Sequence, residues 1–214
     1  MIETNFLSWL QTFSSWYIAL PLLIIIIRWK THDVFRRRVA FYVIFNILFT
    51  LITTLVNHNI FMFYLASPIF LWIIFNIFAT VLSEYKVWNF IKWLVIGFSI
   101  FAVIDMFWIE DYKNKFPDYI YPPQEIIVLF MVYYYLYIFS KEARQDFSAL
   151  WISLGIGFSA LVILIILLYN PYLGFKSNTF GDFIWSGLGS FATIISYSFV
   201  SYGLYIARTS LKNQ

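Results

Sequence analysis

The sequence predicts an all-α fold, a polytopic membrane protein built as a bundle of seven transmembrane helices. Hydrophobic residues make up 62% of its 214 residues and charged residues only 12%, with a mean hydropathy of +0.78, whereas soluble domains carry about 25% charged residues. The apolar residues form runs of roughly 17 to 25, enough for a helix to cross a bilayer. Helices are required because lipid offers backbone amides no hydrogen-bond partner, and the alternating ten-residue segments of a membrane barrel are absent.

Each predicted helix corresponds to one apolar run, and all of them belong to a single transmembrane domain over residues 1–214. The runs cover residues 7–27, 39–57, 60–83, 87–109, 124–140, 147–169 and 181–207. No basic segment precedes the first run and no small-residue cleavage site follows it, so we expect a helix of the mature protein rather than a signal peptide. The connections are too short for a separate soluble domain.

Positive charges are distributed unequally between alternate loops. One side has ten (Arg28, Lys30, Arg36, Arg37, Arg38, Lys86, Lys141, Arg144, Arg208 and Lys212) and the other three (Lys113, Lys115 and Lys176). Because basic loops remain in the cytoplasm, we predict an outside N-terminus, a cytoplasmic C-terminus and a multi-pass protein of the inner membrane. The basic loop of Arg36, Arg37 and Arg38 is expected to meet anionic lipid headgroups or an acidic protein surface, and no nucleic acid is expected as a partner.

Small polar residues follow one face of several predicted helices, with helical spacing. The second run carries Asn46, Thr50, Thr53 and Asn57, the third carries Tyr64, Ser67 and Pro68, and the seventh carries Ser190 and Thr193. Pro68 predicts a kink, because it cannot donate to the carbonyl of Tyr64. The nine residues are a candidate lining of a polar cavity. The alternative is that they only join helices by hydrogen bonds, as the small residues 155–160 would by allowing close approach.

Two carboxylates, Asp105 and Glu125, lie near the predicted outer ends of their helices. They are candidates for a proton or cation entry point, or boundary residues bonded to water, Lys113 or Lys115. The chain has no cysteine and only two histidines, on opposite sides of the membrane. No protease, hydrolase or nucleotide-binding motif is present. We therefore predict no catalytic residues, no metal, no cofactor and no enzymatic activity.

Four segments, NIFMFYLASPIF, YPPQEIIVLFMVYYYLYIF, LWISLGIGFSALVILIILL and IWSGLGSFATIISYSF, resemble a family of small, uncharacterised seven-helix bacterial inner-membrane proteins. The resemblance spans nearly the whole chain and implies its fold and location. Asn59, Ser67, Pro68 and Glu125 match the family pattern. Tyr64, Phe70 and Leu188 replace a His, an acidic residue and a second His, so the resemblance implies no metal, haem or proton-transfer activity here.

Three functions are compatible with these features. The leading interpretation is a non-enzymatic sensor or accessory subunit of a membrane complex, with lipids and a protein partner at its cytoplasmic side. The second is a small-solute transporter or channel with a polar path between the second, third and seventh helices. The third is a lipid-binding or lipid-modifying protein that uses Asp105 and Glu125. The ligand, partner and oligomeric state do not follow from the sequence.

Overall fold

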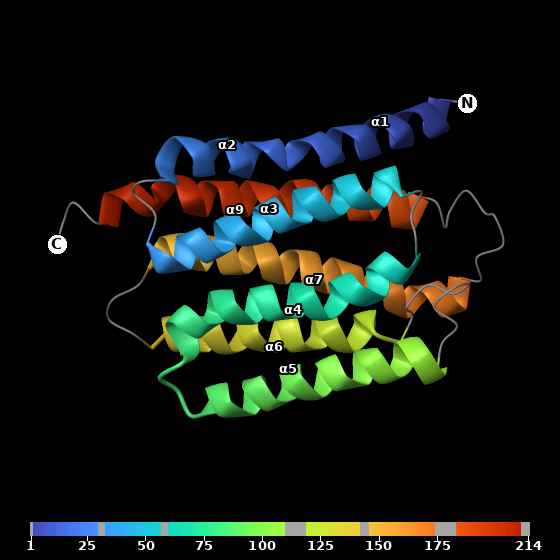
Figure 1. Ribbon diagram of the computed structural model, residues 1–214. Helices are drawn as coiled ribbons and strands as arrows, with labels where there is room; N and C mark the ends of the chain where they lie inside the picture. The colour runs from blue at the N-terminus through green and yellow to red at the C-terminus, as the bar shows by residue number, and fades with distance from the viewer. Residues whose placement is uncertain are drawn as a thin grey trace. The chain divides into compact units, whose positions relative to one another are not determined.

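The structure is a computed structural model that describes residues 2–29, 33–56, 60–109, 119–141, 146–173 and 183–210. All regular structure in these residues is helical (Figure 1). Six helical segments among them are long and apolar enough to cross a membrane: Phe6–Arg28, Phe61–Leu82, Val87–Trp108, Tyr121–Phe139, Phe147–Leu168 and Ser186–Ala207. The prediction of an all-α, multi-pass membrane protein is confirmed.

The first predicted helix is divided into α1 (Ile2–Tyr17) and α2 (Ala19–Arg28). The break falls at Ile18, three residues before Pro21. Proline has no backbone N–H, so Pro21 cannot donate to the carbonyl of Tyr17, and its ring crowds that carbonyl. The local sequence therefore accounts for the interruption, which was not predicted.

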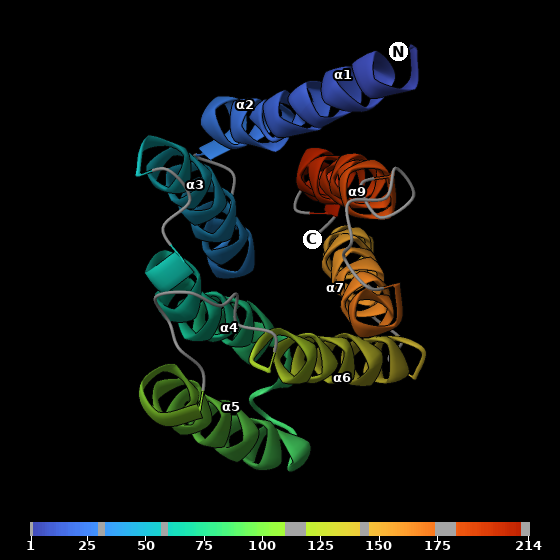
Figure 2. The same ribbon diagram turned by 90° about the vertical axis from the view of Figure 1, so that its right-hand side faces the viewer.

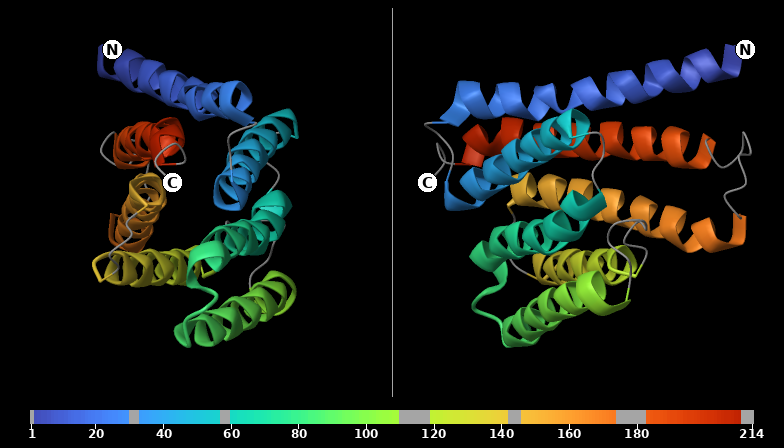
Figure 3. Two further views of the ribbon diagram at one scale, coloured as in Figure 1. Left: turned by 90° about the vertical axis from the view of Figure 1, so that its left-hand side faces the viewer. Right: turned by 45° about the vertical axis from the view of Figure 1, so that its right-hand side comes forward.

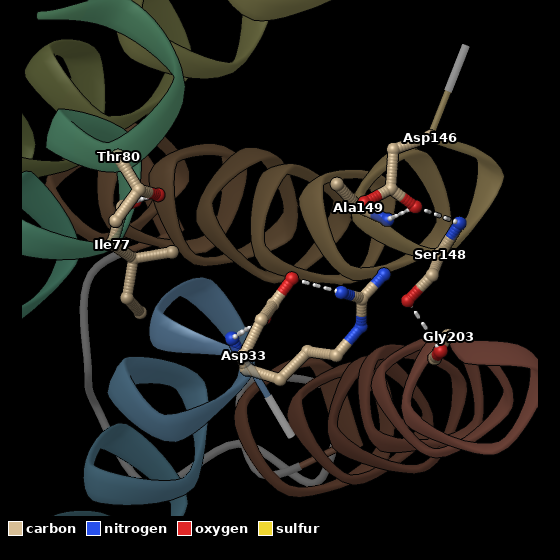
Figure 4. A network of polar contacts seen from close by, with 8 residues as sticks. Asp33, Ile77, Thr80, Asp146, Ser148, Ala149 and Gly203 are labelled. Carbon is tan, nitrogen blue, oxygen red and sulfur yellow. Dashed lines mark hydrogen bonds and ion pairs between the residues drawn. The ribbon is translucent and has the colours of Figure 1, made fainter. Parts of the chain in front are cut away.

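Helix α3 (Val34–Leu55) begins five residues before the predicted start at residue 39. Asp33 caps it, because its side chain accepts a hydrogen bond of 2.9 Å from the backbone N–H of Arg36 (Figure 4), which satisfies one of the free amides of the first turn. The predicted basic loop is thus wrong in one respect, since Arg36, Arg37 and Arg38 lie in the first turns of a helix. Among the described residues, α3 is not one of the six apolar segments.

The α-carbons group into two compact units, described separately below. The first contains residues 1–31 and 141–214, and the second contains residues 32–140. A helix bundle can consist of such units, so the single transmembrane domain stays a prediction.

The first unit contains α1, α2, α7 (Phe147–Leu173), the π-helical turn η3 (Phe183–Leu188) and α9 (Gly189–Ser210). Helices α7 and α9 lie side by side (Figure 2, Figure 3) and α9 also contacts α1 and α2. The side chain of Asp146 caps α7 by accepting from the backbone N–H groups of Ser148 and Ala149 (Figure 4).

A reciprocal pair of hydrogen bonds joins α7 to α9. Ser148 Oγ donates to the carbonyl of Gly203 over 2.6 Å, and Ser196 Oγ donates to the carbonyl of Gly155 over 2.7 Å. In each helix the serine precedes the glycine by seven residues, so two antiparallel helices present matching donors and acceptors. A Cβ added to either glycine would lie 2.7 Å from a backbone oxygen of the other helix. Gly155 confirms the close approach predicted for residues 155–160.

The second unit is formed by α3, α4 (Ile60–Leu82), α5 (Val87–Ile104), the π-helical turn η2 (Asp105–Ile109) and α6 (Tyr121–Phe139). Helix α4 contacts the other three helices. Phe70 of α4 packs edge-on against Phe45 and Phe49 of α3, with ring centroids 4.9 and 5.5 Å apart. An aromatic contact therefore replaces the acidic group that the family resemblance implied at residue 70.

Candidate functional site

The beginning of α6 places two polar side chains inside the second unit. Pro122 and Pro123 occupy its first positions, where a missing N–H costs nothing and the fixed φ suits a helix. Gln124 and Glu125 follow, and both side chains are buried, with 5% and 6% of their surface exposed. Burial of such groups is unfavourable unless they are hydrogen-bonded, so their partners decide what the site can do.

The partners form a continuous hydrogen-bonded chain from α4 to α6. Ser67 Oγ donates to Oε1 of Gln124, and Gln124 Nε2 donates to Oε1 of Glu125 over 2.9 Å. The amide of Gln124 is therefore oriented by both neighbours, with its oxygen toward the hydroxyl and its nitrogen toward the carboxyl group. Below, "the Glu125 site" means Ser67, Gln124 and Glu125.

Helix α4 contributes Ser67 from the interior of a helix that continues through Pro68. Ser67 has no exposed surface, and Tyr64, one turn earlier, is 1% exposed. Tyr64 and Ser67 therefore lie on a buried face of this helix, and the polar cavity that they were expected to line stays a prediction. Gln124 was missed as a site residue, although an amide beside a carboxylate at the start of an apolar run was an available signal.

A second carboxylate, Asp105, belongs to the same unit. It is fully buried and begins the π-helical turn η2, a local widening of the helix that occurs often at functional sites. The last turn of α5 and the first turn of α6 lie at the same end of the unit (Figure 1). Asp105, which follows α5, and Glu125, near the start of α6, therefore both lie toward that end. Both carboxylates are buried, so neither lies in bulk water. The predicted bond to Lys113 or Lys115 involves residues outside those that the structure describes.

The polar residues of α3 bond within their own helix. Asn46 donates to the carbonyl of Tyr42, Thr50 to that of Asn46, and Thr53 to that of Phe49, over 2.9 to 3.0 Å. Such back-bonding satisfies a side chain without a ligand or a second helix. Asn57 lies outside the described residues, so this part of the proposed cavity lining stays a prediction.

The two α9 candidates belong to the first unit. Ser190 is buried, and Thr193 donates to the carbonyl of Gly189 within its own helix. The bonds that join α9 to α7 instead come from Ser196 and Ser148, which were not among the predicted site residues. A seven-residue Ser-to-Gly spacing shared by both helices is the signal that could have identified them.

The described residues contain no group of three or more His, Asp or Glu side chains that could hold a metal ion. Both histidines, His32 and His58, lie outside the described residues. Besides Arg36 and Thr53, the buried polar or charged residues described in the second unit are Ser67, Gln124, Asp105 and Glu125. The hydroxyl, the amide and the two carboxyl groups of these four can form hydrogen bonds, and the carboxyl groups can bind a proton or a small cation.

No protein-family model, curated protein or solved structure matches the chain. The resemblance to small bacterial inner-membrane proteins is therefore supported only as far as the all-helical architecture with its long apolar helices.

Proposed function

We propose that the protein is a transporter or channel for a small solute, and that this solute is a proton or a small monovalent cation bound at Glu125. The observation that carries the proposal is the buried hydrogen-bonded chain from Ser67 through Gln124 to Glu125. It belongs to the second of the functions compatible with the sequence, with the binding site between α4 and α6.

The cost of burying a carboxyl group in a membrane supports this function. A charged side chain in a transmembrane segment is unfavourable by about 2.5 to 3.5 kcal/mol at the helix centre on insertion scales. Glu125 is the one charged residue in the described span Tyr121–Phe139, and it lies in the first two turns of that helix, where the cost is lower than at the centre. A carboxyl group that is retained there, and oriented by an amide, is suited to bind and release a proton or a cation.

The competing role for Glu125 is structural, as a hydrogen-bond acceptor for Gln124. The substitution Glu125→Gln distinguishes the two roles, because glutamine has nearly the same shape and keeps a carbonyl that can accept from Gln124. It cannot ionise. A purely structural residue would tolerate this change, whereas a proton or cation site would not.

The experiment is an ion-flux measurement with purified protein in liposomes. A potassium gradient with valinomycin imposes a membrane potential, and trapped fluorescent dyes report internal pH and sodium concentration. We expect the wild-type protein to admit protons or Na⁺ faster than empty vesicles and Glu125→Gln to reduce this flux to the empty-vesicle rate. Glu84→Gln is the matched control, because Glu84 is an exposed carboxylate in the turn before α5.

Three results would count against the proposal. Equal flux through the wild-type protein and Glu125→Gln would show that the carboxyl group of residue 125 does not carry the ion. Wild-type vesicles that admit neither protons nor Na⁺ would remove the transport function itself. Loss of flux in Glu84→Gln as well would assign the effect to net charge instead of the site.

The other two interpretations stay predictions. If the protein is a sensor or accessory subunit, a protein partner should purify together with it. The lipid-modifying interpretation placed Asp105 and Glu125 among the outer headgroups, and their burial instead favours a site between helices.

A further inference from the structure

A groove of about 440 Å³ lies on the second unit, between the first turns of α3 and the second half of α4. It is lined by Val34, Arg37, Arg38, Phe41, Ile73 and Asn76. Its volume falls within the range of about 300 to 1,000 Å³ that small-molecule sites occupy. The groove is separate from the Glu125 site and does not depend on the proposed function.

One arginine of the groove is held by the neighbouring helix. The guanidinium of Arg38 donates to the backbone carbonyl of Asn76 in α4. This bond uses one of the five N–H donors of the side chain, so the others can face a ligand. A guanidinium that is already oriented loses less conformational entropy when it binds an anion.

The lining is cationic. Arg37 is exposed and lies beside Arg38, and none of the six lining residues is acidic. Asp33, which precedes α3, forms an ion pair with the buried Arg36. The described lining therefore has two basic side chains, Arg37 and Arg38, and no acidic one.

The other walls are apolar. Val34 and Phe41 are 60% and 59% exposed, whereas Ile73 is largely buried and closes the groove. A ligand that contacts both the arginines and the apolar walls must carry an anionic group and a hydrocarbon chain. Arginine binds phosphate oxygens in a bidentate manner, and paired basic residues at the edge of a membrane attract anionic lipids.

We propose that this groove binds an anionic phospholipid, with the headgroup phosphate at Arg37 and Arg38 and an acyl chain along Val34, Phe41 and Ile73. A free phosphate would not use the apolar wall. An acidic protein segment would not require a hydrocarbon chain. The experiment below separates both from a lipid.

The test is native mass spectrometry of the full chain in detergent, titrated with dioleoyl phosphatidylglycerol or dioleoyl phosphatidylcholine. We expect one phosphatidylglycerol to bind with at least about tenfold preference over phosphatidylcholine, because each arginine near a surface adds attraction for anionic lipid. The double substitution Arg37→Gln with Arg38→Gln should abolish that preference. The matched control is Lys86→Gln with Lys92→Gln, which removes two exposed positive charges elsewhere in the unit.

A second variant, Phe41→Ser, retains both arginines and tests the apolar wall. It should weaken the binding of dioleoyl phosphatidylglycerol several-fold while leaving dihexanoyl phosphatidylglycerol unchanged. The proposal would be overturned if the preference for phosphatidylglycerol over phosphatidylcholine survived the double arginine substitution. It would also be overturned if the double lysine substitution removed that preference to the same extent. Displacement of the lipid by millimolar inorganic phosphate, or by an acidic peptide but not by other lipids, would assign the groove to those ligands instead.

Discussion

At the scale of single residues, hydroxyl groups of the second unit donate hydrogen bonds of two kinds. In α3, Thr50 and Thr53 donate their hydroxyl hydrogens to carbonyls of the same helix. In contrast, Ser67 gives its hydrogen to Gln124, a side chain of another helix. If the Ser67 hydroxyl is removed, the buried acceptor on Gln124 loses its donor. The two kinds of hydroxyl therefore differ in what their loss costs.

Ser67→Ala is predicted to destabilise the protein. Loss of the hydroxyl leaves Oε1 of Gln124 buried without that donor, at a cost of about 1 to 3 kcal/mol, so the midpoint of thermal unfolding in detergent should fall by several degrees. Thr80→Val is the control, because Thr80 bonds only the carbonyl of Ile77 in its own helix (Figure 4). Equal midpoints for Ser67→Ala and the wild-type protein would contradict a contribution of this bond to stability.

At the scale of elements, α7 and α9 are held together by backbone proximity. Small residues allow helices to approach until side chains of one meet the backbone of the other, and this type of contact is common in membranes because lipid provides no hydrophobic driving force between helices. Here Gly155 and Gly203 supply both the space and the carbonyl acceptors for Ser196 and Ser148. Packing and hydrogen bonding in this pair thus depend on the same two positions.

Gly155→Ala and Gly203→Ala are predicted to loosen this pair. The added methyl group would lie 2.7 Å from a backbone oxygen of the facing helix, so the helices must separate, and overpacking of this kind costs about 1 to 3 kcal/mol. The measurement is thermal unfolding in detergent micelles. Gly97→Ala is the matched control, since its Cβ would meet nothing within 4 Å, and it should be neutral or slightly stabilising because alanine favours helix formation. Similar loss of stability in all three variants would indicate a general effect of replacing glycine.

At the scale of the whole molecule, hydropathy was enough to predict the helices, and local chemistry decided where they begin and end. The run at 60–83 differs from α4 by one residue at its end, because long apolar stretches in a membrane have no alternative to a helix. The start of α3 was misplaced because the charges of Arg36, Arg37 and Arg38 suggested a loop, whereas the Asp33 cap begins the helix before them. The pairing of Ser67 with Gln124 joins residues 57 positions apart, and no local pattern specifies such a contact.

The orientation of the protein in the membrane is the last prediction, and the absence of cysteine makes it testable in whole cells. Ser83 and Tyr119 are both exposed, and they lie beyond opposite ends of the helical segment formed by α5 and η2. The excess of basic residues predicts that Ser83 faces the cytoplasm and Tyr119 the outside. Tyr119→Cys should then react with a membrane-impermeant maleimide in intact cells, and Ser83→Cys only after the cells are made permeable.

The reverse labelling pattern would invert this orientation. It would also exchange the sides of the two sites proposed above, because the groove at Arg37 and Arg38 lies toward the Ser83 end of the second unit and Glu125 toward the Tyr119 end (Figure 1). With the predicted orientation, an anionic lipid would reach the groove from the cytoplasmic leaflet, where such lipids are concentrated. A proton or cation would reach Glu125 from outside. The two labels therefore decide from which side each ligand should be supplied in the binding and flux experiments.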